Sequence, residues 1–197
     1  MKIISFEGIE GVGKSTQIQM LDSYLKDKGF TTEIFREPGS TVTGEKIRDI
    51  LLYSVEDLSS ETELLLMFSA RAQLIKEKIT NSSNDFILFD RFFDASFAYQ
   101  GYGRGLSLEL INNLIEFTKC PIPSITFLLD ISVDEGFRRK ADDTNDRIES
   151  SGDGFFENVR QGYLDLSKNN NRIKVLDANN SIDDLHQEII NITNQYI

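Results

Sequence analysis

The sequence predicts a doubly wound α/β fold of three layers, in which helices cover both faces of a five-stranded parallel sheet. Apolar runs of strand length alternate with longer stretches of helical periodicity along the chain. Several of these runs lack polar–apolar alternation, as expected of strands that are covered on both faces. A glycine-rich phosphate-binding motif follows directly after the first run. Right-handed crossovers would then place ligands at the carboxyl ends of the strands.

The expected elements follow one another in βα order. Short runs with β-branched and aromatic residues predict strands at Lys2–Phe6, Thr32–Phe35, Phe86–Phe89, Ile125–Asp130 and Ile173–Leu176. The clearest helical patterns are Ser15–Lys28, Glu61–Ile79, Leu108–Phe117, Phe155–Leu166 and Ile182–Ile192. The chain has no internal repeat and no linker composition, so residues 1–197 are expected to form one domain.

Composition excludes several classes of protein. A net charge of −11 argues against a general nucleic-acid or membrane-surface binder, which would need a basic face. No apolar run is long enough for a transmembrane helix, and the N-terminus leads directly into a predicted strand rather than a signal peptide. Cys120 is the only cysteine, so no internal disulfide is expected. We therefore expect a cytoplasmic protein that binds neither nucleic acid nor membranes.

The phosphate-binding motif is the P-loop pattern G-x-x-x-x-G-K-S, which begins at Gly8 and ends at Ser15. Its glycines let backbone N–H groups turn inward around anionic oxygens, and the following helix N-terminus favours negative charge. Lys14 can reach the β- and γ-phosphates, and the Ser15 hydroxyl can bind Mg²⁺. The alternative is an ordinary glycine-rich turn, which the flanking strand and helix disfavour. The candidate ATP-binding residues are Gly8, Ile9, Glu10, Gly11, Val12, Gly13, Lys14, Ser15 and Thr16.

Further charged residues follow the next predicted strands. Asp90 ends one strand, where a P-loop protein places a carboxylate near Mg²⁺, and Arg91 can hold a phosphate in a bidentate fork. The segment Arg36–Gly39 and Arg48 are further candidate anion clamps. A surface salt bridge is the alternative for Arg91. The chain lacks the N-K-x-D and D-x-x-G motifs, so a GTPase switch is not expected.

Two other stretches could complete a nucleotide site. Phe68 and Arg71 are spaced to lie on one helical face, where an aromatic ring can stack on a base while a guanidinium bonds its edge. Taken alone, Met67 and Phe68 are more often core residues than a base platform. The charged segment 138–154 is expected to be a mobile lid over the triphosphate, and a solvated loop is its alternative.

Taken together, these stretches resemble the thymidylate kinase family along the whole chain. The resemblance rests on FEGIEGVGKSTQ, REPG, TGEKIR, LLLMFSARAQL, DRFFDASFAYQGYGRGL, and DRIE followed by FFENVRQGYLDL. It implies a homodimer that transfers the γ-phosphate of ATP to dTMP, giving dTDP, with Mg²⁺ as cofactor. A deoxynucleoside kinase is the alternative enzyme, but the several phosphate-facing arginines favour a monophosphate acceptor. A nucleotide-dependent interaction module is the non-enzymatic alternative.

The resemblance also implies roles for individual residues. Arg91 would bind the dTMP phosphate, Glu37 would position phosphate and metal, and Arg71 and Gln100 would contact the thymine edge. Tyr99 would disfavour a 2′-hydroxyl, and the Pro38 peptide would be cis. The implied catalytic residues are Lys14, Glu37, Arg91 and Arg147, and the implied metal ligands are Ser15 and Asp90. The implied dTMP-binding residues are Glu10, Arg36, Pro38, Arg48, Met67, Phe68, Arg71, Arg91, Ser96, Tyr99 and Gln100.

The sequence departs from the family pattern in several places. Phe92 replaces a Tyr or His that often follows the DR pair, and the usual stacking aromatic corresponds to Met67, with Phe68 next to it. The lid carries Asp142 and Asp143 where the family is often basic. The P-loop contains no arginine, so the lid would have to supply positive charge to the transferred phosphoryl group. We expect Arg147 to close over the nucleotide, and Arg138 or Lys140 to reach the phosphates.

Overall fold

The computed structural model describes residues 1–55, 57–140 and 146–197. Within these residues, five parallel strands form one sheet in the order β2–β3–β1–β4–β5. The strands are β1 (Lys2–Glu7), β2 (Thr32–Arg36), β3 (Phe86–Asp90), β4 (Ile125–Asp130) and β5 (Ile173–Asp177). The predicted fold class is therefore confirmed.

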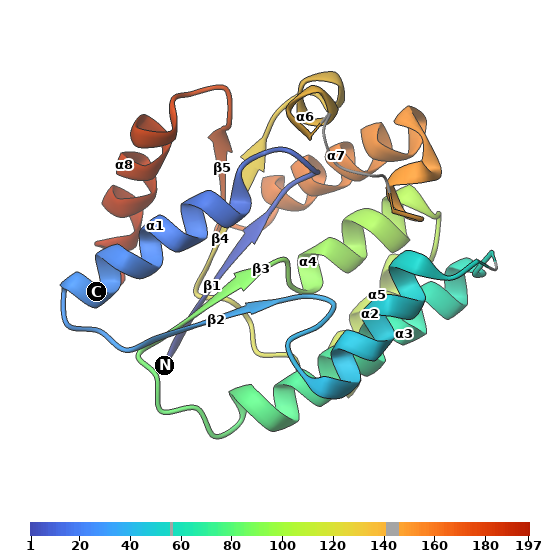
Figure 1. Ribbon diagram of the computed structural model, residues 1–197, viewed down its shortest axis with the longest axis horizontal. Coiled ribbons are helices and arrows are strands. Elements are labelled where there is room, and N and C mark those ends of the chain that lie inside the picture. Colours follow the sequence, from blue (N-terminus) through green and yellow to red (C-terminus); the bar gives the residue numbers. More distant parts are fainter. Residues whose placement is uncertain (56, 141–145) are drawn as a thin grey trace.

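Helices cover both faces of this sheet. Figure 1 shows α1 and α8 side by side on one face, with α3, α5 and α7 on the other. The helices are α1 (Lys14–Asp27), α2 (Val42–Tyr53), α3 (Ser60–Leu74), α4 (Phe93–Ser96), α5 (Leu108–Phe117), α6 (Val133–Lys140), α7 (Asp153–Lys168) and α8 (Ile182–Thr193). Two π-helical segments, η1 (Ile75–Ile79) and η2 (Phe97–Gly103), continue α3 and α4, and a 3₁₀ turn, η3 (Glu149–Ser151), precedes α7. No described helix has the length and apolar character to cross a membrane.

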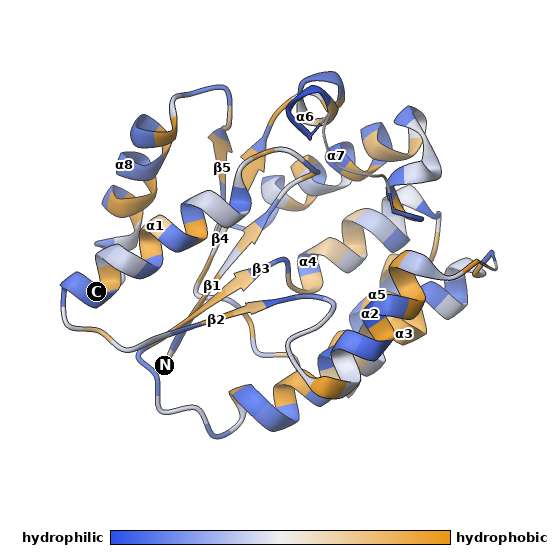
Figure 2. Cartoon of the chain, in the orientation of Figure 1, coloured by the Kyte–Doolittle hydropathy of each residue, from blue (hydrophilic) through white to orange (hydrophobic). Residues whose placement is uncertain are grey.

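Alternate strand residues pack against the two helical layers. Phe6 and Phe127 lie on neighbouring strands with ring centroids 5.3 Å apart and belong to the same core cluster as Leu21 of α1. On the other face, Phe89 stacks on Phe92 with centroids 4.3 Å apart. Figure 2 shows the central strands mostly apolar and the outer sides of the helices polar. This two-sided burial explains the apolar runs that lacked alternation.

The predicted strands are found at or within one residue of their expected ends, and their polar last residues Glu7, Arg36, Asp90 and Asp177 are part of the strands. The predicted helix Glu61–Ile79 consists of α3 and η1 together. The segment expected to be a lid or loop is partly helical, because Arg138, Arg139 and Lys140 complete α6. Arg138 and Arg139 both bond to Glu135 one turn earlier, which supports that helix. Residues 141–145, including Asp142 and Asp143, lie outside the described residues.

Candidate active site

The carboxyl ends of three adjacent strands bring the predicted motifs together. In the register of the sheet, Asp90 of β3 is paired with Phe6 of β1 and with Arg36 of β2. The P-loop, the segment after Arg36, and Arg91 therefore meet at one edge of the sheet. They border a cavity of about 420 Å³.

The P-loop backbone depends on its glycines. Gly8 and Gly11 have φ angles of 133° and 72°, a region that disfavours other residues. A Cβ atom on Gly11 would lie 2.0 Å from the carbonyl oxygen of Gly136, and one on Gly8 would lie 2.4 Å from that of Leu129. The loop therefore packs directly against β4 and α6.

Lys14 and Ser15 begin α1 at the floor of the cavity. Lys14 Nζ donates to the carbonyl oxygens of Gly8 and Ile9 at 3.2 and 2.8 Å. Burial, followed by the neighbouring charge of Arg91, lowers the pKa of Lys14 to about 8. The Ser15 hydroxyl donates to Asp90 Oδ2 at 3.0 Å. A hydroxyl and a carboxylate in contact are a suitable start for a Mg²⁺ site, since this ion prefers oxygen ligands.

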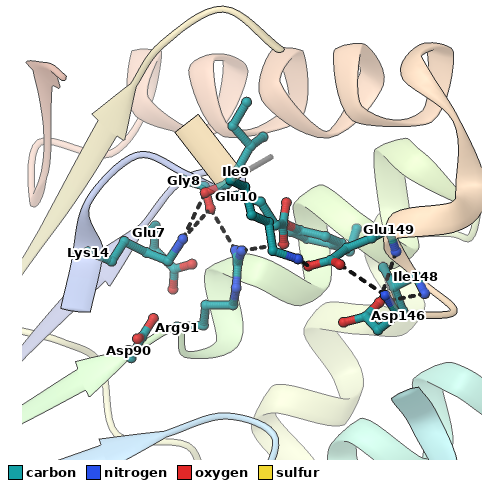
Figure 3. A network of polar contacts seen from close by, with 12 residues as sticks. Glu7, Gly8, Ile9, Glu10, Lys14, Asp90, Arg91, Asp146, Ile148 and Glu149 are labelled. Carbon is teal, nitrogen blue, oxygen red and sulfur yellow. Dashed lines mark hydrogen bonds and ion pairs between the residues drawn. The ribbon is translucent and has the colours of Figure 1, made fainter. Parts of the chain in front are cut away.

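Arg91 points from the end of β3 toward the P-loop (Figure 3). Its Nη1 donates to the Gly8 carbonyl oxygen at 2.6 Å, and its Nη2 donates to Glu10 Oε1 at 2.7 Å. The Tyr99 hydroxyl donates to the same carboxylate oxygen at 3.0 Å, and the Arg91 guanidinium lies 4.9 Å from the centre of the Tyr99 ring. Arg91 has a positive φ of 65°, which turns its side chain out of the strand direction.

A buried acid, Glu7, is linked to Arg91 through Tyr163. The sequence analysis did not identify it. Glu7, the last residue of β1, accepts hydrogen bonds from the Phe92 amide at 2.7 Å and the Tyr163 hydroxyl at 2.8 Å. Burial, with the nearby charge of Asp94, raises the pKa of Glu7 to about 8. The Tyr163 hydroxyl in turn accepts from Arg91 Nη1 at 3.3 Å. The sequence did offer one signal for Glu7, because this acidic residue lies between the first predicted strand and the P-loop.

Arg71 and Glu37 form a second ion pair beside the cavity, and this pair is buried. Arg71 Nε donates to Glu37 Oε2 at 2.7 Å, and Arg71 Nη1 donates to Ser96 Oγ at 3.1 Å. Burial raises the pKa of Glu37, although the charge of Arg71 opposes this shift. The Phe68 ring lies 4.6 Å from the Arg71 guanidinium and belongs to the core, whereas Met67 lines the cavity. Of Met67 and Phe68, Met67 is therefore the one that faces the cavity.

The predicted anion clamps lie at the mouth of the cavity. The peptide before Pro38 is cis, as predicted. Arg48 Nη1 donates to the Pro38 carbonyl oxygen at 3.0 Å, and the exposed Arg36 pairs with Glu45 at 2.8 Å. Both arginines line the cavity.

Behind Gln100 lies a buried acid that the sequence did not reveal. Glu63 of α3 is buried and accepts from Gln100 Nε2 at 3.0 Å and from Arg104 Nη2 at 3.1 Å. Arg147 Nη2 donates to the same carboxylate at 2.6 Å, and Arg147 Nε donates to the Leu51 carbonyl oxygen at 2.8 Å. Arg147 is thus held against α2 and α3 and is not among the residues that line the cavity.

On the lid side, Lys140 is the basic residue that lines the cavity. Lys140 forms an ion pair with Glu149. Glu149 also accepts from the Asp146 amide at 3.0 Å (Figure 3). Arg138 is turned away, with 73% of its side chain exposed.

Most predicted site residues are brought to one place. Those that line the cavity are Glu10, Gly11, Lys14, Ser15, Arg36, Glu37, Pro38, Arg48, Met67, Arg71, Asp90, Arg91, Ser96, Tyr99 and Gln100. Gly8, Ile9, Val12, Gly13 and Thr16 lie in the P-loop or at the start of α1 but outside this lining. Phe68 and Arg147 also lie outside it.

Comparison with known proteins identifies the family. A family model described as thymidylate kinase matches residues 6–189. This chain belongs to the thymidylate kinase family. The thymidylate kinase of Kosmotoga olearia is 43% identical over 192 residues, which cover 95% of this chain and 92% of that protein. That of Thermoanaerobacter sp. is 40% identical over 200 residues, covering 100% and 98%.

A solved thymidylate kinase supports the same assignment at the level of structure. The crystal structure of the Ehrlichia chaffeensis thymidylate kinase superposes with a TM-score of 0.80 at 31% identity, covering 98% of each chain. The family and the enzyme class predicted from the sequence are therefore confirmed.

Proposed function

We propose that this thymidylate kinase uses the described cavity to transfer the γ-phosphoryl group of MgATP to the phosphate of dTMP, giving dTDP. The observation that carries the proposal is the composition of that one cavity. It combines the P-loop Lys14 with the guanidinium groups of Arg36, Arg48, Arg71 and Arg91.

The donor end is formed by the P-loop. Its backbone N–H groups and Lys14 would hold the β- and γ-phosphates, and Ser15 and Asp90 would hold the Mg²⁺. When bound, the ion neutralises phosphate charge and orients the phosphate oxygens. In the structure Lys14 donates to two loop carbonyls, and these donors would transfer to phosphate oxygens when ATP binds.

The acceptor end is formed by the arginines. Arg91 would hold the dTMP phosphate in line with the γ-phosphate, with Arg36 and Arg48 beside it. Catalysis of phosphoryl transfer consists chiefly of such positioning together with charge stabilisation. Glu37 fixes the Arg71 guanidinium and would also position phosphate and metal through water.

The nucleoside end would bind deoxyribose and thymine. Arg71 and Gln100 would bond the base edge, Met67 would cover its face, and Tyr99 with Glu10 would border the sugar. Tyr99, whose hydroxyl donates to Glu10 Oε1 at 3.0 Å, would disfavour a 2′-hydroxyl on the sugar.

One assay separates this activity from that of a deoxynucleoside kinase. The purified chain is incubated with ATP and Mg²⁺ and with thymidine, dTMP, dUMP or dCMP, and ADP release is followed. Turnover of dTMP but not of thymidine is the expected result. Turnover of thymidine without dTMP would contradict the proposal.

The remaining expectations concern the whole molecule. We expect a single domain whose segment 138–154 acts as a lid, a cytoplasmic location where both substrates are available, and a homodimer. Support for a dimer comes from apolar residues that α3 and α5 expose in the single chain, namely Leu65, Leu110 and Phe117. Sedimentation at micromolar protein concentration tests this, and a monomer would contradict it.

A further inference from the structure

The buried carboxylate of Glu63 contacts the one residue of the base site whose side chain has two chemically different ends. Gln100 carries an N–H₂ donor and a carbonyl acceptor on a flat amide, and either end could face a ligand. The bonding partners of the amide therefore decide which end is presented.

Glu63 can only accept hydrogen bonds as long as it stays ionised. Burial opposes ionisation, but hydrogen bonds from Arg104, Gln100 and Arg147 outweigh it and lower the pKa of Glu63 below its usual value. The two guanidinium groups also balance its charge inside the protein. Glu63 is therefore an acceptor at neutral pH, and only the N–H₂ end of Gln100 can bond to it.

The other end of the amide faces the cavity. Gln100 Nε2 lies 3.0 Å from Glu63 Oε1, and Gln100 itself lines the cavity. Among the described residues, no donor bonds to the Gln100 carbonyl oxygen, and this oxygen is not among the fully buried side-chain atoms that lack a hydrogen-bond partner, so part of its surface is accessible. The side chain thus offers a fixed hydrogen-bond acceptor to a base.

We propose that Glu63 is a positioning residue that locks the Gln100 amide with its oxygen toward the base, so that the site accepts pyrimidines with an N3–H donor and rejects cytosine. Thymine and uracil both carry this donor, whereas N3 of cytosine is an acceptor that would face the Gln100 oxygen without a proton between them. This inference rests on the proposed binding of thymine at Gln100, and it adds the residue that sets the polarity of that contact.

The variant Glu63→Gln tests the idea because a neutral amide of the same shape can donate as well as accept. The Gln100 amide could then flip, which would exchange the positions of its N–H₂ group and its carbonyl oxygen. Calorimetry of the full-length protein with dTMP, dUMP and dCMP gives three dissociation constants for each variant. In Glu63→Gln we expect the preference for dTMP over dCMP to fall by about tenfold, the size of one hydrogen-bond contribution. The preference for dTMP over dUMP should stay within about twofold, since both bases have the same N3–H.

Glu61→Gln is the matched control, because Glu61 is exposed on the same helix. It should change none of these ratios. If Glu63→Gln weakens all three ligands by the same factor, Glu63 serves only to hold the fold and the proposal is wrong. Failure of the proposed function would look different, because wild-type protein would then not bind dTMP in the first place.

A measurement on wild-type protein covers the case in which Glu63→Gln does not fold. The side-chain N–H₂ signals of Gln100, assigned by their loss in Gln100→Met, are followed by nitrogen-15 NMR. Bonded to a buried carboxylate, these protons should exchange slowly with water in the ligand-free protein. Exchange as fast as that of exposed glutamines would mean that the N–H₂ end faces the cavity, which overturns the proposal.

Discussion

Arg91 Nη2 and Glu10 Oε1 lie 2.7 Å apart, an ion pair that ties the end of β3 to the P-loop. About one sixth of each side chain is exposed, 17% and 15%, so the pair is largely withdrawn from water. The other terminal nitrogen of Arg91, Nη1, donates to the Gly8 carbonyl oxygen. The guanidinium is thus held beside the P-loop, where we propose that it lies between the donor and acceptor phosphates.

Replacing Arg91 by Ala should lower kcat/KM for dTMP by about 10²-fold or more. The reason is that loss of the guanidinium leaves the acceptor phosphate misplaced, and misplacement alone costs about this much. Steady-state kinetics with a thermal melt of each variant checks this. Arg91→Lys keeps the charge but loses the fork, so it should recover only part of the rate. Near wild-type kcat/KM in Arg91→Ala would refute the assigned role.

Replacing Ser15 by Ala should raise the Mg²⁺ concentration needed for half-maximal activity, by about tenfold. The variant removes the hydroxyl that lies 3.0 Å from Asp90 Oδ2. Activity titrated with MgCl₂ at fixed ATP measures the effect, and EDTA should abolish activity in the wild type. Ser23→Ala on the same helix is the control, because the Ser23 hydroxyl bonds only the Gln19 carbonyl oxygen among the described residues. Equal Mg²⁺ curves for Ser15→Ala and Ser23→Ala would exclude Ser15 as a metal ligand.

Replacing Glu7 by Gln should weaken the loss of stability that the wild type suffers as pH rises from about 4.5 to about 8. Burial and then Asp94 raise the pKa of Glu7 from 4.5 to about 8. Between these values the folded chain keeps a proton that the unfolded chain has released, so the free energy of unfolding falls as pH rises, by at most about 1.4 kcal/mol per pH unit. The pKa of Lys14 is lowered to about 8, so Lys14 changes the pH dependence of the free energy of unfolding only above this pH range.

Urea denaturation at about pH 5.5 and pH 7.5 measures the Glu7 effect. The difference between the two pH values should be smaller in Glu7→Gln than in the wild type, and unchanged in the exposed control Glu61→Gln. A difference as large in Glu7→Gln as in the wild type would show that another group is responsible.

The features predicted from the sequence are those encoded by neighbouring residues. Gly8, Lys14 and Ser15 form one local motif, and Asp90 and Arg91 adjoin at a strand end, so the parallel sheet alone brings both groups to one edge. The strands could also be predicted from neighbouring residues, because a continuous apolar run is typical of a strand that is buried on both faces.

The features that escaped prediction depend on partners far apart in the chain. Glu7 and Tyr163 are separated by 156 positions, and no local pattern announces their contact. The ion pair of Arg147 with the buried carboxylate of Glu63, 84 positions away, was not predicted either. A charged side chain in a sequence has several possible partners, and only the packed fold selects among them.

The positive charge for the transferred phosphoryl group should come from Lys140. The P-loop has no arginine between Gly8 and Gly13, and of the four described basic lid residues, Arg138, Arg139, Lys140 and Arg147, only Lys140 lines the cavity. Its present partner is Glu149, and exchange of that carboxylate for a phosphate oxygen would bring the ammonium group onto the developing charge.

Lys140→Ala should therefore lower kcat by about tenfold or more, while KM for dTMP changes little. Arg147→Ala should instead raise KM for dTMP, because it disturbs Glu63 and, through it, Gln100. Lys168→Ala, which removes an exposed lysine of α7, is the control for loss of charge alone. If Lys140→Ala keeps kcat within about threefold of wild type, roughly 0.7 kcal/mol of activation free energy, Lys140 does not supply the charge.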